Sequence, residues 1–197
     1  MAGLLRELSG ESPGAQVQLV AHSAGVLDAA AVAGDLRGRV VRWLLPGTGI
    51  PGVGAMLRAQ RAAAQRNLAS DADLGEILRT RALPTGHPVF HFGPSEKRAV
   101  GDEVLARYQG PEHVAVVAKL LLRRSLTPGR WAGARVALIA SAGDLVAPPA
   151  AMRAATEWFV ARGAHAALHV VDEPLPHMFM MFESGAERVA ELLASPA

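Results

Sequence analysis

The segment from Val17 to Val32 restricts the fold of this chain more than any other stretch of its sequence. Four residues that suit a buried strand, Val17–Val20, run into a turn of small residues around Ser23, and a helix-forming segment follows. A strand, a sharp turn and a helix in this order raise the central side chain of the turn above the edge of a sheet. The small side chains of Ala21 and Gly25 suit a strained turn. The first amides of the helix point toward the turn, where they could stabilise a negative charge. The segment therefore predicts an α/β sheet with Ser23 as a candidate nucleophile.

The composition is typical of a single globular domain. The chain has 197 residues, and 50% of them are hydrophobic, which is enough for a sizeable core. The formal net charge is only +2, and no dense tract of Lys and Arg alternates with aromatic residues, so nucleic acid is not an expected partner. The absence of cysteine excludes disulfides, thiolate nucleophiles and cysteine-bound zinc. Residues 1–12 lack the apolar core of a signal peptide, and no apolar run could span a membrane, so we expect a cytoplasmic protein.

Expected strands and helices alternate in the first and last parts of the chain. The expected strands are 17–20, 39–45, 134–140 and 166–171. The expected helices are 2–9, 26–33, 149–162 and a closing helix that runs from Met178, or from the region of Ser184, to Leu193. This alternation predicts an α/β fold with a mostly parallel sheet and helices on both of its faces.

The middle of the chain has a different character. No convincing strand occurs between Pro46 and Gly133. Four segments there have a helical pattern: 55–68, 71–81, 96–108 and 113–124. We interpret residues 46–132 as a helical cap or lid that is inserted into a core made of residues 1–45 and 133–197.

Three side chains that could act together follow three different expected strands. A serine hydroxyl becomes a good nucleophile when a base takes its proton, and the base needs a carboxylate to orient it. In parallel α/β sheets such groups lie on loops at the carboxyl ends of the strands. Ser23 follows the first expected strand, Asp144 the third and His177 the fourth. The sequence therefore predicts that these three side chains meet at one edge of the sheet.

The order Ser, Asp, His and its placement resemble the α/β-hydrolase superfamily. The residues that carry the resemblance are the elbow Ala21–Gly25, the acid loop Gly143–Pro149 and the histidine loop Glu173–His177. The resemblance covers about residues 15–45 and 133–195, and the segment between them carries no motif of the family.

The resemblance implies a role for each residue of the site. Ser23 would be the nucleophile, His177 the general base and acid, and Asp144 the partner that holds the imidazole. The backbone N–H of Ala24 would donate to the oxyanion, and His22 would pack beside the serine or position it. A serine at the elbow, rather than an aspartate, favours acyl transfer to water. The implied function is hydrolysis of a small-molecule ester or thioester, with no cofactor and no metal.

The start of the chain departs from the family pattern. Ala21 stands where the family usually has glycine, which is a mild change. In the family several strands precede the elbow, and the loop after one of them donates the second oxyanion N–H, whereas only sixteen residues precede Val17 here. We therefore expect the early strands of the family fold to be missing and the first strand to have an exposed edge. The alternative is a weak or inactive hydrolase-like module that dimerises or binds a partner through this edge.

Two other motifs have simpler interpretations. Gly47–Gly52 matches the G-x-G-x-x-G pattern of dinucleotide-binding loops. The second strand and its acidic residue are missing, and Pro51 removes one phosphate-binding amide, so a lid hinge is the better interpretation. His87 and His91 have the spacing of metal ligands on a helix, but Pro88 disfavours a helix there.

The last expected strand and the segment after it contain further candidates. His169 lies within the strand and is expected to be a partly buried structural histidine, whereas His165 precedes the strand and is expected to be solvated. The segment Met178–Phe182 is apolar throughout. It is expected to pack in the core, or to line a pocket for an acyl chain.

Overall fold

The computed structural model describes residues 15–23, 25–33, 38–48 and 131–195, together with positions 58 and 62. Within this part of the chain, four strands form one parallel sheet in the order β1-β2-β3-β4. The strands are β1 (Val17–Val20), β2 (Val40–Pro46), β3 (Arg135–Ser141) and β4 (His165–Val171). The helices are α2 (Gly25–Ala33), α8 (Pro149–Val160) and α9 (Glu183–Ala194), and a short 3-10 helix, η5 (Phe179–Met181), precedes α9.

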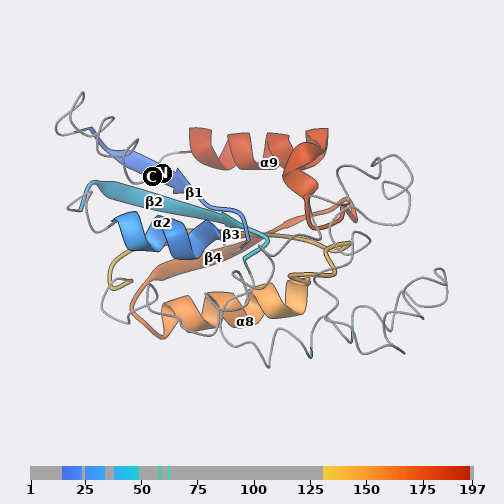
Figure 1. Cartoon of the computed structure of the whole chain (residues 1–197), viewed down its shortest axis with the longest axis horizontal. Coiled ribbons are helices and arrows are strands. Elements are labelled where there is room, and N and C mark those ends of the chain that lie inside the picture. The colour runs from blue at the N-terminus through green and yellow to red at the C-terminus, as the bar shows by residue number, and fades with distance from the viewer. Residues whose placement is uncertain are drawn as a thin grey trace.

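Helices cover both faces of the sheet (Figure 1). Helices α2 and α8 lie against one face, and α9 lies against the other. Successive side chains of a strand point to opposite faces, so a strand that is buried on both faces is apolar throughout. In β3, Val136 and Leu138 pack on the side of α2 and α8, whereas Ala137 and Ile139 pack on the side of α9. The predicted α/β class, with its parallel sheet and helices on both faces, is confirmed.

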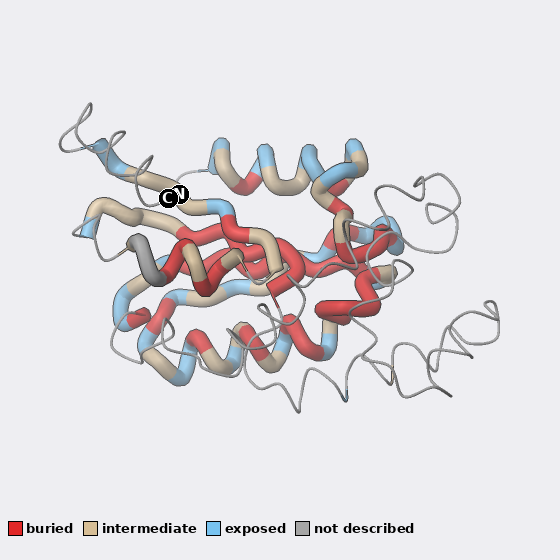
Figure 2. The backbone as a smooth tube through the Cα atoms, in the orientation of Figure 1, coloured by how far each residue is buried: buried red, intermediate tan, exposed pale blue. Residues whose placement is uncertain are grey.

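The larger core lies between the sheet and helices α2 and α8, and Figure 2 shows buried stretches in the strands and in turns of both helices. Its aromatic centre is Trp131, whose ring centroid lies 4.9 Å from that of Trp43 and 4.7 Å from that of Phe159, in edge-to-face geometry. Trp131 thus packs in the sheet domain, although its position falls within the range 46–132 that the sequence analysis assigned to the insertion. This core holds the sheet against α8, and the loops of the candidate site leave the sheet beside it.

Three of the strands begin or end one residue away from their expected boundaries, and β2 shows why. We expected Pro46 to stop this strand, but Pro46 is its last residue. A proline is tolerated at this position because its carbonyl still accepts a hydrogen bond from the Ser23 N–H at 3.0 Å. The next amide, that of Gly47, donates to the carbonyl of Ile139 at 2.9 Å and continues the contact with β3.

One of the two starts expected for the closing helix is confirmed. Helix α9 begins at Glu183, next to Ser184, and not at Met178. Before it, Phe179 is fully buried in the core under α9, as expected for this apolar segment, whereas Met181 is 71% exposed.

The helix expected at residues 2–9 and nearly all of the expected insertion lie outside the described residues, as do His87 and His91. None of the helices in the described ranges combines the length and the hydropathy that crossing a membrane requires.

Candidate active site

Ser23 lies in a tight turn between β1 and α2. Its backbone φ is 54°, and among the described residues it alone, apart from glycines, has a positive φ. For a residue with a side chain, this left-handed conformation is less stable by roughly 1–3 kcal/mol, so the surrounding structure must hold it there. The Ser23 N–H donates to the carbonyl of Pro46, and the N–H of Gly25 donates to the carbonyl of His22 at 2.9 Å. Among the described residues, and apart from its chain neighbours and the backbone of its own helix, no atom lies within 4 Å of the position that a β-carbon would take at Gly25.

The hydroxyl of Thr48 ties this turn to the end of β2. Thr48 is fully buried, and its Oγ1 lies 3.3 Å from the carbonyl oxygens of Ala21 and Ser23 and 3.2 Å from that of Pro46. A hydroxyl has one proton, so these three carbonyls share one donor. This side chain therefore helps to hold the strained turn. Thr48 lies within the Gly47–Gly52 motif, but the interpretation of that motif as a lid hinge did not predict this role.

Asp144 lies in the turn that follows β3, and its carboxylate is fully buried. Oδ1 accepts hydrogen bonds from the backbone N–H groups of Val146 and Ala147, both at 2.8 Å. Oδ2 lies 2.9 Å from Nδ1 of His177. Burying an unpaired carboxylate would be very costly, whereas three donors satisfy the charge here and fix the direction of the second oxygen.

His177 is almost fully buried and faces Asp144 through its Nδ1. A carboxylate oxygen can only accept a hydrogen bond, so Nδ1 carries the proton in this contact. In the neutral ring, Nε2 then has the free electron pair and is the basic nitrogen. The contact with Asp144 thus sets the tautomer that a general base requires.

The acid loop and the histidine loop are also joined through their backbones. The buried hydroxyl of Ser141, at the end of β3, lies 2.7 Å from the carbonyl of Leu175 and 3.2 Å from that of Glu173. Gly143 lies so close to the other loop that a β-carbon there would come within 2.2 Å of the carbonyl oxygen of Pro174. These contacts set the distance between the loops. Gly143 belongs to the predicted acid loop, but its close approach to Pro174 was not predicted, and the role of Ser141 was missed because this residue belongs to no motif.

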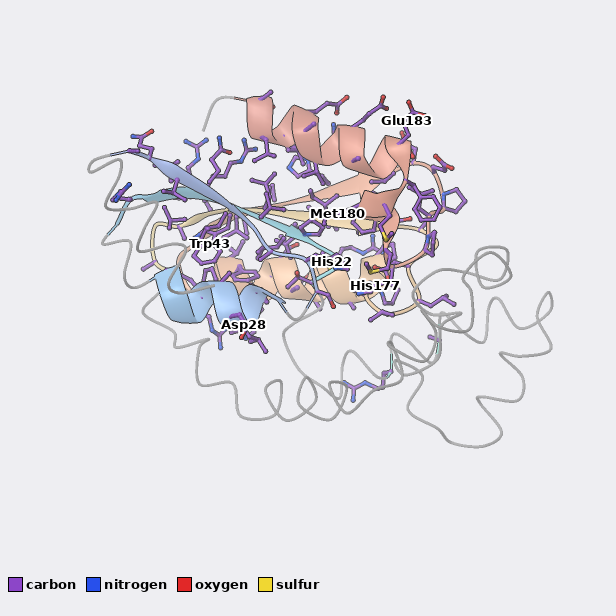
Figure 3. All side chains as sticks on the ribbon, turned by 45° about the horizontal axis from the view of Figure 1, so that its top comes forward. His22, Asp28, Trp43, His177, Met180 and Glu183 are labelled. Atoms are coloured by element: carbon purple, nitrogen blue, oxygen red, sulfur yellow. The ribbon has the colours of Figure 1, made fainter. Side chains whose placement is uncertain are left out.

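His22 links the serine turn to the histidine loop (Figure 3). Its Nε2 lies 3.0 Å from the carbonyl oxygen of His177, and the two imidazole rings are 4.6 Å apart. Burial, followed by the charge of His177, lowers the pKa of His22 from 6.5 to about 4. His22 is therefore neutral near pH 7.

The imidazole rings of His22 and His177 both pack against Gly47. It has a φ of 58°, and a β-carbon there would lie 2.9 Å from Cε1 of His177 and 3.2 Å from Nε2 of His22. Its chain neighbour, Pro46, holds the Ser23 amide. The turn that carries Ser23 and the imidazole of His177 therefore meet at the end of β2.

The structure thus brings the Asp144 and His177 side chains into direct contact. The backbone turn at Ser23 lies beside this pair, because His22 and Gly47 contact both the turn and the His177 loop. Ala24, the expected oxyanion donor, lies outside the described residues.

Two other histidines lie outside the candidate site. His169 is partly buried in β4, 3.4 Å from Nη2 of Arg188, and burial lowers its pKa. His165 is the first residue of β4 and is exposed, as expected. In the ranges that the structure describes, no three His, Asp or Glu side chains gather closely enough to hold a metal ion.

The structure is similar to those of α/β-hydrolase enzymes. The esterase RhEst1 from Rhodococcus sp. ECU1013 matches with a TM-score of 0.56 and 20% sequence identity, over 100% of this chain and 72% of that protein. An α/β-hydrolase enzyme from a Medee basin deep-sea metagenome library matches with a TM-score of 0.52 and 15% identity, over 98% of this chain and 69% of that protein. A thermophilic esterase from Thermogutta terrifontis matches with a TM-score of 0.51 and 19% identity, over 98% of this chain and 67% of that protein.

These similarities show that the chain has an α/β-hydrolase fold and that it corresponds to only part of each of these larger proteins. No family model and no curated protein sequence matches it.

Proposed function

We propose that this chain is a serine hydrolase that cleaves an ester-like bond, an ester or a thioester, in a small molecule. The observation that carries the proposal is the buried pair of Asp144 and His177, whose Oδ2 and Nδ1 atoms are 2.9 Å apart. This pair adjoins a turn that holds Ser23 in a left-handed conformation between a strand and a helix. The α/β-hydrolase fold supports a hydrolase, and two of the neighbours named above are esterases.

In the proposed reaction, Nε2 of His177 takes the hydroxyl proton of Ser23 while the serine oxygen attacks the carbonyl carbon of the substrate. The N–H of Ala24 donates to the resulting oxyanion. His177 gives the proton to the leaving alcohol or thiol, and an acyl-serine remains. The same imidazole then takes a proton from a water molecule, whose oxygen attacks the acyl carbon. As the bond between the acyl group and the serine oxygen breaks, the imidazolium returns this proton to Ser23, and the acid is released. Asp144 stays ionised and stabilises the imidazolium in both steps.

The Ser23→Ala variant tests this proposal. We expect it to lose labelling by a fluorophosphonate probe, and its kcat for a p-nitrophenyl ester to fall by on the order of 10⁶-fold, because the attacking oxygen is gone. Ser195→Ala is the matched control, since Ser195 is exposed at the end of α9 and its hydroxyl donates to the carbonyl of Glu191, outside the site. Equal turnover by the Ser23→Ala variant and the unmodified protein would remove the proposal.

A second candidate function is partner binding at a sheet edge. Strand β1 is the first strand in the sheet order, and in the described part of the chain it pairs only with β2. The side chain of Val20 on this strand is 41% exposed. An apolar edge strand can pair with a strand of another chain, so this edge favours a dimer or a complex over an isolated subunit.

A further inference from the structure

His22 contacts the loop that carries the proposed general base. The contact is made by the backbone of His177, since Nε2 of His22 lies 3.0 Å from the carbonyl oxygen of that residue. The ring of His22 is held on a second side by Phe179, at 6.3 Å between centroids and nearly perpendicular to it. The orientation of the His22 ring is therefore set by the same loop that it binds.

The partner determines which nitrogen of His22 carries the proton. A carbonyl oxygen only accepts hydrogen bonds, so Nε2 must be protonated in this contact. The titratable groups that act on His22 are His177 and Asp144, and burial together with the charge of His177 lowers its pKa to about 4. His22 is thus a neutral donor near pH 7, with its proton on Nε2.

We propose that His22 is a positioning residue: its Nε2–H holds the backbone of His177 against the serine turn and thereby keeps the imidazole in place for proton transfer. This inference rests on the proposed function, because it gives His22 a task in the same reaction. Gly47 supports it, since both imidazoles pack against the face of this glycine and leave no room for a β-carbon. The rate depends strongly on the placement of the base, because a displacement of about 1 Å can lower it on the order of 100-fold.

Two substitutions separate the hydrogen bond from the packing of the ring. His22→Phe keeps an aromatic ring and loses the donor, whereas His22→Gln can place an amide N–H near the original Nε2. On p-nitrophenyl butyrate we expect His22→Phe to lower kcat about tenfold or more with little change in KM, and we expect His22→Gln to recover most of this loss. His169→Phe is the matched control, because His169 lies in β4 and contacts Arg188 outside the site. We expect this control to keep the unmodified kcat.

A measurement on the resting protein makes the test independent of turnover and of the folding of any variant. Nitrogen-15 NMR of the imidazole groups should show His22 as the neutral tautomer protonated at Nε2 near pH 7. Protonation at Nδ1 instead would overturn the inference, because the bond to the His177 carbonyl could not then exist. A kcat of the His22→Phe variant equal to that of the unmodified protein would overturn it too. Failure of the proposed function looks different, since Ser23→Ala would then leave ester turnover unchanged while the tautomer of His22 stays as described.

Discussion

The lowered pKa of the His22 side chain makes the free energy of unfolding depend on pH. Its pKa falls from 6.5 to about 4 in the folded state, so between these values the unfolded chain binds more protons than the folded one. The free energy of unfolding therefore decreases as the pH falls from above 6.5 toward 4. The pKa difference corresponds to roughly 2–3 kcal/mol of stability between pH 7.5 and pH 4.5. This contribution is fully present above pH 6.5.

Urea unfolding at several pH values measures this contribution. We expect the unmodified protein to lose roughly 2–3 kcal/mol more than the His22→Gln variant between pH 7.5 and pH 4.5, because glutamine does not titrate. The pKa of His169 is also lowered, but this residue is present in both proteins and its effect cancels in the comparison. Parallel pH profiles of the two proteins would show that His22 keeps an ordinary pKa.

Asp144 sets the tautomer of His177, and an asparagine there would reverse it. In Asp144→Asn, the side-chain oxygen can still accept the N–H groups of Val146 and Ala147, so the turn is expected to keep its shape. The amide NH₂ would then face Nδ1 of His177, which has to become an acceptor and place its proton on Nε2. We expect kcat for a p-nitrophenyl ester to fall on the order of 10⁴-fold while the protein stays folded.

An exposed aspartate gives the control for this substitution. Asp172 follows β4 and is exposed. The Asp172→Asn variant changes the net charge by the same amount, and we expect it to leave kcat unchanged. Equal losses of activity in the two variants would show that net charge, not the contact with His177, is what the substitution at Asp144 removes.

At the scale of the elements, the site depends on the approach of the loop after β3 to the loop after β4. Gly143 sets this distance, because a β-carbon there would press on the backbone of Pro174 and Leu175. Backbone atoms cannot rotate away as a flexible side chain can, so one of the loops has to move. We expect Gly143→Ala to lower the free energy of unfolding by about 1–3 kcal/mol and to reduce activity, since Asp144 and His177 lie on the two loops that separate.

Denaturant unfolding of Gly143→Ala beside Gly25→Ala checks this expectation. Gly25 is the first residue of α2, and a β-carbon there would contact none of the described residues beyond its own helix, so its substitution should change stability by less than about 1 kcal/mol. If the two variants were equally stable, the close approach of the loops would have no energetic weight.

The elements themselves could be predicted because their signals are local. The strand at Val17–Val20 has the predicted bounds, since the apolar run ends at a turn that its own residues encode. The extension of β2 to Pro46 could not be predicted, because it depends on hydrogen bonds to Ser23 and to Ile139 across the sheet. The 3-10 turn before α9 is likewise set by the packing of Phe179 under that helix.

At the scale of the whole molecule, the parallel sheet makes part of the site predictable. Groups at the carboxyl ends of neighbouring parallel strands share one edge, so a nearby Asp144 and His177 follow from the order of the strands. The residues that hold this arrangement leave no such trace. Thr48 and Ser141 are buried hydroxyls whose partners lie up to 34 positions away along the chain. Their roles depend on which loops meet in space, and a single sequence does not encode that in any short pattern.

The edge of β1 that pairs with no other strand in the described ranges concerns the molecule as a whole, because it bears on whether the chain acts alone. An apolar side chain on an edge strand favours pairing with another strand, whereas a lysine at such an edge opposes it. We expect the apparent mass of the chain in light scattering to rise with concentration, and Val20→Lys to reduce this association. Val160→Lys is the matched control, since Val160 is 53% exposed at the end of α8, away from the edge. A constant monomer mass for the unmodified protein at all concentrations, together with full esterase activity, would show that the edge is not used and that the single chain is the working unit.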